Sequence, residues 1–430
     1  MTDKTNQSSR SGFTGLGIAP GLLDAIDRLK FTEPTPIQRQ SIPVTIKGKD
    51  LIAIAQTGTG KTLAYGIPMI QRLAQIKGQG LVIAPTRELA LQVDEALNDI
   101  GRSLGLRTTV LIGGASMSAQ LRSLKQKPRI IVATPGRLID HIEHRTVNLS
   151  DVRILVLDEA DRMLDMGFAP QIKKILAVVP KKRQMMLFSA TIPEQILTLA
   201  RREMEFPIHV EVAPSGTAPE KIIQEMFFVE RNAKTQLLEV MLERYLGPVL
   251  IFTRTKYGAR RLAREIRSLG HTAAEIHSNR SLSQRREALD GFKSGKYRAL
   301  VATDVASRGI DVTGIELVVN YDLPTNTEDY VHRIGRTGRA GHAGRSVSFA
   351  TLDQKKDVKS IERLIRSDLP ASALPALPPP RKRPPATKSS GSSPRQRRQS
   401  SARRPSKKPS RPPRQSKRKS HKGKKRVKRD

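Results

Sequence analysis

Short runs of aliphatic and β-branched residues alternate with longer amphipathic stretches from about residue 20 to residue 365. This alternation is typical of parallel βαβ units. In the first half, strands are expected at Leu51–Ala55, Leu81–Ala84, Thr108–Ile112, Ile130–Ala133, Ile154–Leu157 and Met185–Phe188. Helices are expected between them at Lys61–Ala74, Glu88–Gly101 and Ala119–Lys125. The first half of the chain therefore reads as one parallel α/β domain.

The alternation pauses at 213–219, where Pro, Gly and Ser predict a linker, and then resumes. Strands are expected at Val249–Phe252, Ala273–Ile276, Ala299–Ala302, Glu316–Asn320 and Ser346–Phe349, and helices at Lys256–Leu269 and Ser283–Lys293. No strict sequence repeat relates the two halves. We therefore predict two α/β domains with parallel sheets, residues 1–212 and 220–369, joined by the linker.

The composition changes after residue 369. Residues 371–380 are rich in Ala, Pro and Leu, and the rest is Pro, Ser, Lys and Arg without any aromatic residue. Such a segment cannot bury a core, so we predict that residues 370–430 form a disordered tail. Of the formal net charge of +36, residues 381–430 carry +21, which leaves +15 for the other 380 residues. A basic body with a more basic tail predicts a polyanion as partner.

Several classes of protein are disfavoured by composition. The chain has no cysteine, which excludes disulfides and thiolate metal sites and fits a reducing compartment. The first residues lack the apolar core of a signal peptide, and no apolar run reaches the roughly 20 residues of a membrane span. We expect a cytoplasmic protein without membrane association.

A phosphate-binding loop is predicted where the first strand ends, at Ala55-Gln56-Thr57-Gly58-Thr59-Gly60-Lys61-Thr62. A loop between strand and helix is the context in which backbone N–H groups and a helix N-terminus cradle phosphates. Lys61 can reach the β- and γ-phosphate oxygens, and the Thr62 hydroxyl can bind Mg²⁺. Ala55 replaces the usual first glycine, so the motif by itself indicates only that a nucleotide binds.

An apolar strand ends in two carboxylates at Asp158 and Glu159. Asp158 suits a second contact to Mg²⁺, partly through water, and Glu159 suits activation of the water that attacks a γ-phosphate. Ser189-Ala190-Thr191 ends the next strand, and by itself this short hydroxyl motif is a weak signal because it can equally cap a helix.

A cluster of cations occupies the second half between Tyr330 and Arg339. If this segment is helical, Arg336 and Arg339 are three residues apart and share one face. Such a pair can act as arginine fingers that stabilise charge on the transferring phosphoryl group. Because both lie outside the domain of Lys61, hydrolysis would then depend on closure of the two domains.

Taken together, these residues resemble a DEAD-box ATP-dependent RNA helicase, and in detail the bacterial RhlE-type subgroup. Asp158-Glu159-Ala160-Asp161 spells the motif that names the family, and the resemblance runs from about residue 13 to residue 366. It implies two tandem RecA-like domains, ATP and Mg²⁺ as cofactors, and RNA as partner. Other family motifs occur in order at Phe31, Pro34–Gln38, Pro85–Leu89, Gly113-Gly114, Thr134–Arg137, Ser189–Thr191, Val249–Arg254, Ala302–Asp311 and His332–Arg339.

The resemblance also implies residue roles at the ATP site. Phe31 would stack on adenine, Gln38 would hydrogen-bond its edge, and Asp311 would hold the ribose, while Phe13 is the upstream aromatic residue of the nucleotide site. The catalytic set would be Lys61, Asp158, Glu159, His332, Arg336 and Arg339. Ser189, Thr191 and Asp161 would couple hydrolysis to unwinding.

For RNA, the resemblance implies contacts to the backbone and little sequence specificity. The matching positions are Arg87, Gly114, Thr134, Arg137, Arg254, Arg285 and Thr303. One departure concerns Leu282, which stands where the family often has Gln and cannot make the polar contact of an amide. The basic tail would add salt-sensitive affinity for structured RNA.

The expected function is RNA-stimulated ATP hydrolysis coupled to local unwinding of short duplexes and remodelling of RNA or RNA–protein complexes. One alternative is an ATP-switched RNA clamp or annealing chaperone with little unwinding. A DNA helicase or translocase is disfavoured by the family motifs only. We expect a monomer, and the resemblance is compatible with partners in ribosome assembly or RNA decay.

Overall fold

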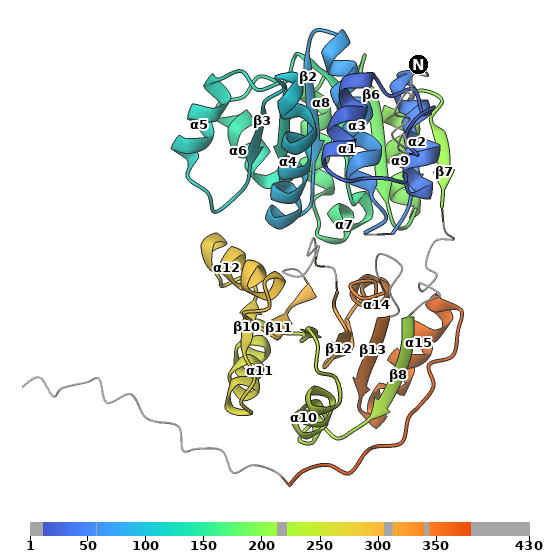
Figure 1. Ribbon diagram of the computed structural model, residues 1–430, viewed down its shortest axis with the longest axis vertical. Helices are drawn as coiled ribbons and strands as arrows, with labels where there is room; N and C mark the ends of the chain where they lie inside the picture. Colours follow the sequence, from blue (N-terminus) through green and yellow to red (C-terminus); the bar gives the residue numbers. More distant parts are fainter. Residues whose placement is uncertain are drawn as a thin grey trace, which may run out of the picture. The chain divides into compact units, whose positions relative to one another are not determined.

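The computed structural model describes residues 12–56, 58–212, 222–304, 312, 314–338 and 344–379. Two parallel sheets with their own helices account for this part of the chain (Figure 1). The predicted linker at 213–219 lies outside the described residues, as do Thr57, Asp311, Arg339 and residues 380–430.

The first sheet has seven strands in the order β3-β4-β2-β5-β6-β1-β7, and all its strand pairs are parallel. Its strands are β1 (Leu51–Ile54), β2 (Gln79–Ile83), β3 (Thr108–Leu111), β4 (Ile130–Ala133), β5 (Val152–Leu157), β6 (Gln184–Ser189) and β7 (Ile208–Glu211). The helices are α1 (Pro20–Arg28), α2 (Pro36–Ile46), α3 (Lys61–Gln75), α4 (Arg87–Gly101), α5 (Met117–Lys125), α6 (Pro135–Glu143), α7 (Ala160–Asp165), α8 (Ala169–Val178) and α9 (Glu194–Glu203), with a 3₁₀ turn, η1 (Arg102–Leu104).

Both faces of this sheet are covered, which explains why its central strands are continuous apolar runs. Leu51 and Ala53 of β1 point into a core shared with α1 to α4, while Ile52 between them points into a second core shared with α6 to α9. Since side chains alternate along a strand, an apolar residue is needed at every position. The carboxyl ends of the strands are therefore left as the place for polar chemistry.

The second sheet has six strands in the order β10-β11-β9-β12-β13-β8, again all parallel. Its strands are β8 (Ile222–Phe228), β9 (Val249–Phe252), β10 (Ala273–Ile276), β11 (Ala299–Ala302), β12 (Leu317–Asn320) and β13 (Gly344–Ala350). The helices are α10 (Lys234–Arg244), α11 (Lys256–Ser268), α12 (Leu282–Lys293), α14 (Glu328–Ile334) and α15 (Lys355–Ile365), with a 3₁₀ turn, η2 (Leu352–Gln354). Helices α10 and α11 share a core with one face of β9, and α12 shares a core with the other.

The predicted fold class is confirmed, with two parallel-sheet α/β domains of RecA-like form. All eleven expected strands occur, and each boundary lies within two residues of its expected position. Two strands were missed, β7 and β8, which lie at sheet edges. In β7 three of four residues are exposed, including His209 and Glu211, so it carries no apolar run that a pattern could detect.

The structure also moves the predicted boundary at residue 370. Ser372 donates its backbone N–H to Met226 of β8 at 2.8 Å, and Met226 donates its own to Pro370 at 3.0 Å. Further on, Leu377 packs against the core of the second sheet, and Gln236 donates to the Pro378 carbonyl. Residues 370–379 are thus part of the second domain, because an apolar side chain and backbone hydrogen bonds attach them to it.

Within the described ranges, no helix has the length and apolar character needed to cross a bilayer. In the same ranges, no group of three or more His, Asp or Glu side chains stands close enough to form a protein-only metal site.

Candidate functional site

The predicted phosphate loop lies between β1 and α3. Gly58 and Gly60 both have a φ of +87°, a left-handed conformation that glycine adopts without strain. Lys61 is 6% exposed and donates from Nζ to the Ala55 carbonyl at 3.1 Å. The lysine side chain is therefore folded back onto the first residue of its own loop.

Gln38 anchors this loop from α2. Its Nε2 donates to the Gly60 carbonyl at 3.0 Å, and its Oε1 accepts from the Thr35 backbone N–H at 3.0 Å. A Cβ at position 60 would lie 2.4 Å from that Nε2. Gly60 is thus required both for its backbone angle and for the close approach of Gln38, and the predicted adenine-reading amide stands next to the phosphate loop.

The two predicted aromatic contacts to adenine have different environments. Phe31 is 41% exposed, as a stacking platform must be, whereas Phe13 is fully buried in the first core. The Gly12 backbone N–H donates to the Thr32 carbonyl at 2.7 Å, which holds the Phe13 segment beside the Phe31 loop. The assignment of Phe13 as an ATP contact is therefore corrected. This residue belongs to the first core and has no exposed surface to offer a ligand.

Asp158 is 2% exposed at the carboxyl end of β5. Its Oδ2 accepts a hydrogen bond of 2.9 Å from the Tyr65 hydroxyl, which also bonds Thr62. Its Oδ1 has no hydrogen-bond partner among the described residues. Burial raises the pKa of Asp158 to about 6, against the opposing attraction of Lys61. Tyr65 thus connects the two predicted magnesium ligands.

Glu159 follows with a φ of +51°, left-handed for a residue that is not glycine. Such backbone strain clusters at functional sites. Its Oε2 lies 3.6 Å from Nη1 of Arg162, a side chain that is only 1% exposed. Neither Nη1 nor Nη2 of Arg162 has a hydrogen-bond partner within the described part of the chain. Buried guanidinium N–H groups without hydrogen bonds are suited to bind an anion or water.

The predicted coupling residues are brought together around one carboxylate. Oδ2 of Asp161 accepts from the backbone N–H of Ala190 at 3.0 Å and of Thr191 at 2.8 Å, and from the Thr191 hydroxyl at 3.0 Å. Ser189 accepts from the Asp161 backbone N–H at 3.2 Å. The loop after β6 is therefore bound directly to the helix that follows the paired carboxylates, and a shift of either element would move the other.

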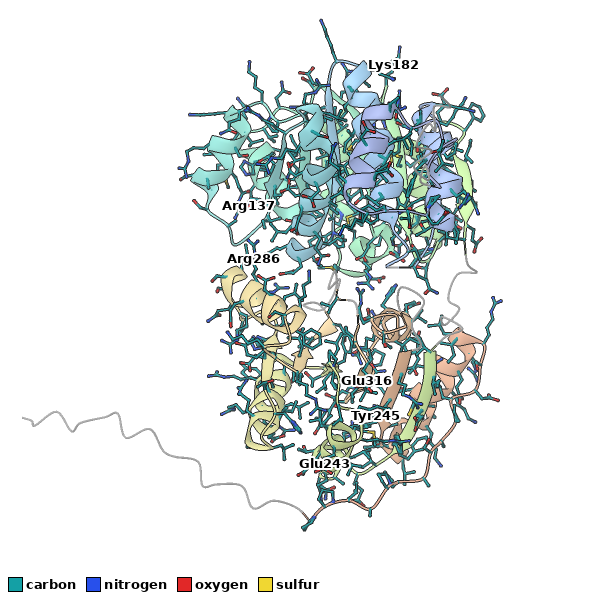
Figure 2. All side chains as sticks on the ribbon, viewed as in Figure 1. Arg137, Lys182, Glu243, Tyr245, Arg286 and Glu316 are labelled. Carbon is teal, nitrogen blue, oxygen red and sulfur yellow. The ribbon has the colours of Figure 1, made fainter. Side chains whose placement is uncertain are left out.

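The predicted RNA contacts of the first domain lie after β2, β3 and β4. Arg87, at the start of α4, covers Gly114, where a Cβ would be 2.3 Å from its Nη1. The glycine thus makes room for an arginine, and not only for a nucleic-acid chain as expected. Arg137, which is labelled in Figure 2, lies in the first domain. It donates to the Ala115 carbonyl at 3.1 Å and pairs with Asp140 at 3.3 Å. Thr134 caps α6 without a hydrogen bond from its side chain.

In the second domain, the predicted RNA contacts follow β9 and β11 and begin α12. The Arg254 backbone N–H donates to Asp322 at 3.1 Å, and its Nη2 lies 3.4 Å from the Leu323 carbonyl. Arg285 donates from Nη2 to Oε2 of Glu88 at 2.8 Å, and both side chains are nearly buried. Thr303 is half-buried at the end of β11.

Leu282, one turn before Arg285, packs partly buried against the core of the first domain. The departure from the family pattern thus has a structural consequence, because an apolar contact takes the place of a polar one. Burial raises the pKa of Glu88, while Arg285 opposes that shift.

Arg336 is 2% exposed and donates from Nε to the His332 carbonyl at 3.2 Å. The condition that Arg336 lies on a helix is not met. Helix α14 ends at Ile334, where Gly335 follows as its C-cap. His332 and Arg336 line a small cavity together with Arg162.

Three buried residues that the sequence analysis did not single out lie beside the predicted catalytic residues. Tyr65 and Arg162 are two of them, and Arg333 is the third. Arg333 binds Asp304 through two hydrogen bonds of 2.5 and 2.8 Å, bonds Asn320 at 3.1 Å, and lies 5.0 Å from the Phe252 ring. An arginine inside an apolar helix pattern was the available signal, since a buried guanidinium needs partners.

Comparison with known proteins is consistent with this geometry. Residues 35–199 match the model of the DEAD/DEAH box helicase family, and residues 233–341 match that of the helicase conserved C-terminal domain. The "ATP-dependent rRNA helicase RRP3" of Debaryomyces hansenii is 42% identical over 380 residues, covering 87% of this chain and 80% of the relative. The Candida albicans protein of the same name is 44% identical over 367 residues, with 84% and 69% covered. These fungal relatives do not support the bacterial RhlE-type subgroup.

Solved structures give the same result. "S. cerevisiae Dbp5 bound to RNA and ADP BeF3" superposes with a TM-score of 0.77 at 30% identity, covering 85% of this chain and 96% of that one. "Mss116p (NTE and C-tail double deletion) bound to ssRNA and AMP-PNP" also gives 0.77, at 28% identity, with 86% and 81% covered.

Proposed function

This chain belongs to the DEAD-box ATP-dependent RNA helicases, and we propose that its ATP site is composite, with Lys61 holding the phosphates and Arg336 completing the site from the second domain. The chain is an RNA helicase that hydrolyses ATP to ADP and phosphate. Its unwinding is local, and it remodels RNA in a cycle of binding, closure and release.

The observation that carries the proposed site is the set of buried polar atoms without hydrogen bonds at the carboxyl edge of the first sheet. Oδ1 of Asp158 and both Nη atoms of Arg162 lack hydrogen-bond partners among the described residues. Such atoms are costly unless a ligand satisfies them. The donor set fits Mg²⁺, which Asp158 and Thr62 would hold and which would neutralise charge on the phosphates.

The proposed reaction places an acid–base residue opposite the cations. Glu159 orients and deprotonates the attacking water, and Lys61 holds the phosphate oxygens. Arg336, with Arg339 beside it in sequence, stabilises the negative charge on the transferring group, and His332 supports that segment. Asp161 couples ATP hydrolysis to unwinding, because hydrogen bonds join it to Ser189 and Thr191.

Glu159→Gln tests this assignment. We expect RNA-stimulated ATP hydrolysis to fall by about 10²- to 10⁴-fold, the usual contribution of a general base, while ATP and RNA still bind. Glu143→Gln, at an exposed position on α6, is the matched control. Hydrolysis that survives in Glu159→Gln would contradict the role of Glu159.

The variant Lys61→Ala distinguishes the helicase from the alternative function, an RNA clamp or annealing chaperone. A helicase loses unwinding with this change, because the phosphates lose their cation. If strand annealing and cellular activity persist unchanged in the variant, ATP acts at most as a switch and the clamp is the better description.

The substrate assignment rests on the RNA-bound relatives and on the names of the fungal rRNA helicases. We infer that the RNA backbone binds at Arg87, Gly114, Thr134 and Arg137 of the first domain and at Arg254, Arg285 and Thr303 of the second, and that ribosomal RNA is a target. Crosslinking of RNA to the protein in cells, followed by sequencing, tests the target. ATPase assays with RNA and DNA in parallel test the polymer, and equal stimulation by both would overturn the RNA assignment.

Adenine selectivity rests on Phe31 and Gln38, with Asp311 at the ribose. The RhlE-type subgroup is a proposal from motif details alone, and closer similarity to other subgroups across bacterial helicases would refute it. A monomer in the cytoplasm, with partners in ribosome assembly or RNA decay, is likewise proposed. Sedimentation and fractionation test these points.

A further inference from the structure

A groove of about 750 Å³ opens at the carboxyl ends of β9 and β12 in the second domain. Arg254 lines it, together with Tyr257 and Arg261 of α11. Arg231, Asp353 and Asp357 also line the groove. None of these residues except Arg254 has a role in the proposed ATP and RNA sites.

Tyr257 gives this groove an exposed aromatic surface. Its side chain is 72% exposed, whereas the other five tyrosines of the chain are buried or half-buried. The Lys256 ammonium lies 5.3 Å from the ring centroid, so one cation already sits close to the ring. An exposed ring beside cations is the arrangement on which bases of single strands stack, whatever their sequence.

The outer face of α11 continues the cationic surface away from the groove. Arg260, Arg261, Arg264 and Arg267 are all solvent-accessible, while Ala259, Leu262, Ala263 and Ile266 are buried against the sheet. The acid on this helix is Glu265, which lies 3.6 Å from Arg261. A row of arginines along one helix face suits a phosphate backbone better than a neutral or basic surface of another protein.

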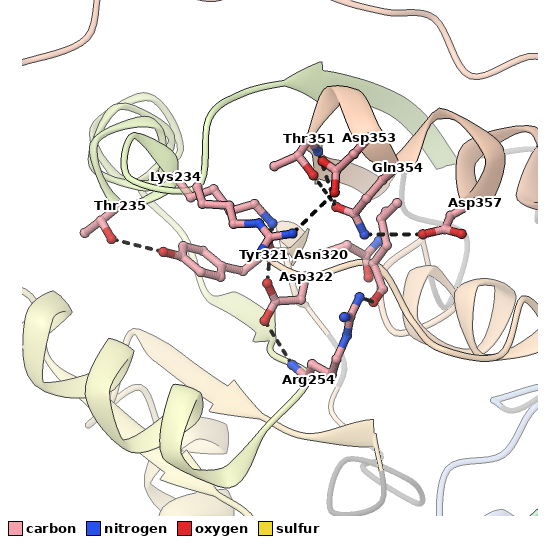
Figure 3. A network of polar contacts seen from close by, with 12 residues as sticks. Lys234, Thr235, Arg254, Asn320, Tyr321, Asp322, Thr351, Asp353, Gln354 and Asp357 are labelled. Carbon is pink, nitrogen blue, oxygen red and sulfur yellow. Dashed lines mark hydrogen bonds and ion pairs between the residues drawn. The ribbon is translucent and has the colours of Figure 1, made fainter.

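The acids of the groove are partly engaged with its own cations. Figure 3 shows Asp322 between Lys234, at 3.4 Å, and the Arg254 backbone N–H, at 3.1 Å. Asp353 pairs with Arg231 at 3.3 Å. The interior of the groove is therefore nearly neutral, and the excess positive charge lies on α11. This division fits a base inside the groove and its phosphates outside, along the helix.

We propose that the groove and the outer face of α11 form an accessory site for single-stranded RNA, in which Tyr257 stacks on a base and Arg261 and Arg264 contact phosphates. The site lengthens the RNA path beyond Arg254, and so it rests on the proposed role of Arg254 for its position. It increases affinity for longer strands without reading their sequence.

The test uses the full chain with two unstructured RNAs, one covering only the proposed contacts of the two domains and one about twice as long. In the native protein the longer RNA binds more tightly. We expect Tyr257→Ala to lower affinity for the longer RNA about tenfold, equal to about 1.4 kcal/mol, with a much smaller change for the shorter one. Arg363→Glu, a charge reversal at an exposed position of α15 that does not line the groove, is the control for charge reversals on α11.

The salt dependence adds a second readout. The Arg261→Glu/Arg264→Glu double variant should reduce the slope of log affinity against log salt by about 0.7 for each phosphate that it no longer binds, and Arg363→Glu should not. A 5-iodouridine within the longer RNA should crosslink to Tyr257. Equal losses of affinity on both RNAs, or no loss on either, would overturn the accessory site. If the native protein shows no stimulation by any RNA, the proposed function itself fails.

Discussion

Asp158 holds a negative charge where the fold disfavours one, so its removal should stabilise the protein. The carboxyl group is 2% exposed, and burial raises its pKa from 3.8 to about 6, even though Lys61 attracts the charge and Tyr65 donates a hydrogen bond. Asp158→Asn keeps the shape and an oxygen acceptor for the Tyr65 hydroxyl, but it removes the charge. We expect this variant to lose ATP hydrolysis and gain stability.

The magnitude follows from the pKa shift. A difference of about two units between the unfolded and folded protein corresponds to about 3 kcal/mol, at 1.36 kcal/mol per unit. Because the pKa is raised on folding, the native state holds the proton more tightly. The contribution of Asp158 to stability is therefore fully present below its unfolded pKa of 3.8 and is lost as the pH rises through about 6. Asp158→Asn should recover up to about 3 kcal/mol at neutral pH and flatten this dependence.

Asp161→Asn is the matched control, since the same substitution three residues later should have the opposite sign. Oδ2 of Asp161 accepts three hydrogen bonds from Ala190 and Thr191, and Oδ1 accepts one of 2.9 Å from the Arg162 backbone N–H. An amide NH₂ in place of either oxygen would face donors. We expect a loss of about 1 to 3 kcal/mol for the buried groups left unsatisfied.

The assay is hydrogen exchange of the first-domain strands and of α3, with neither nucleotide nor Mg²⁺, at about pH 5 and pH 7.5. Exchange resolves the first domain from the second, which a single melting curve does not. The reasoning is refuted if Asp158→Asn destabilises the first domain at neutral pH, or if both variants shift it in the same direction.

Two further predictions concern backbone and charge. Gly60→Ala should weaken ATP binding by at least about tenfold in a nucleotide titration. The reason is that φ at this position is +87° and the new Cβ would lie 2.4 Å from Gln38 Nε2. Gly105→Ala, with a φ of +71° and open space around it, controls for backbone strain alone. Arg285→Ala should lower the free energy of unfolding by about 3 to 5 kcal/mol, as expected when a buried ion pair, here with Glu88, loses one partner. That loss should shrink at acid pH as Glu88 takes up a proton, and a pH-independent loss in hydrogen exchange of α4 would contradict it.

The buried strands could be predicted from the sequence because their successive side chains point into two different apolar cores, so every residue of such a strand must be apolar. The β1 run and the loop after it are the clearest case, since Leu51–Ile54 leads directly into glycines with left-handed angles. The edge strand β7 could not be predicted in this way. It is a strand because its backbone hydrogen-bonds to β1, and backbone pairing of this kind does not require apolar side chains in the sequence of β7.

The candidate site was predicted where two motifs follow neighbouring strands of one sheet. Asp161 and Thr191 met as expected because each follows a strand of the same sheet, β5 and β6. The assignment of Phe13 to the ATP site was wrong because this residue is buried in the first core, which pattern alone does not show. The helix considered for Arg336 ends two residues earlier, before a glycine whose effect depends on the local backbone.

Buried charged residues mark the candidate site, because burial otherwise selects mainly apolar residues in the first domain. Almost every buried residue of the first sheet is apolar, yet Asp158, Glu159 and Arg162 lie at its carboxyl edge with exposures of 1 to 2%. A structure optimised only for stability would not keep charged side chains there, because burial of an ion costs more than its neighbours return. The raised pKa of Asp158 is a measure of that cost. The cost is consistent with a site whose charges are balanced only when Mg²⁺ and a triphosphate bind, so the first domain should be most stable with its substrate bound.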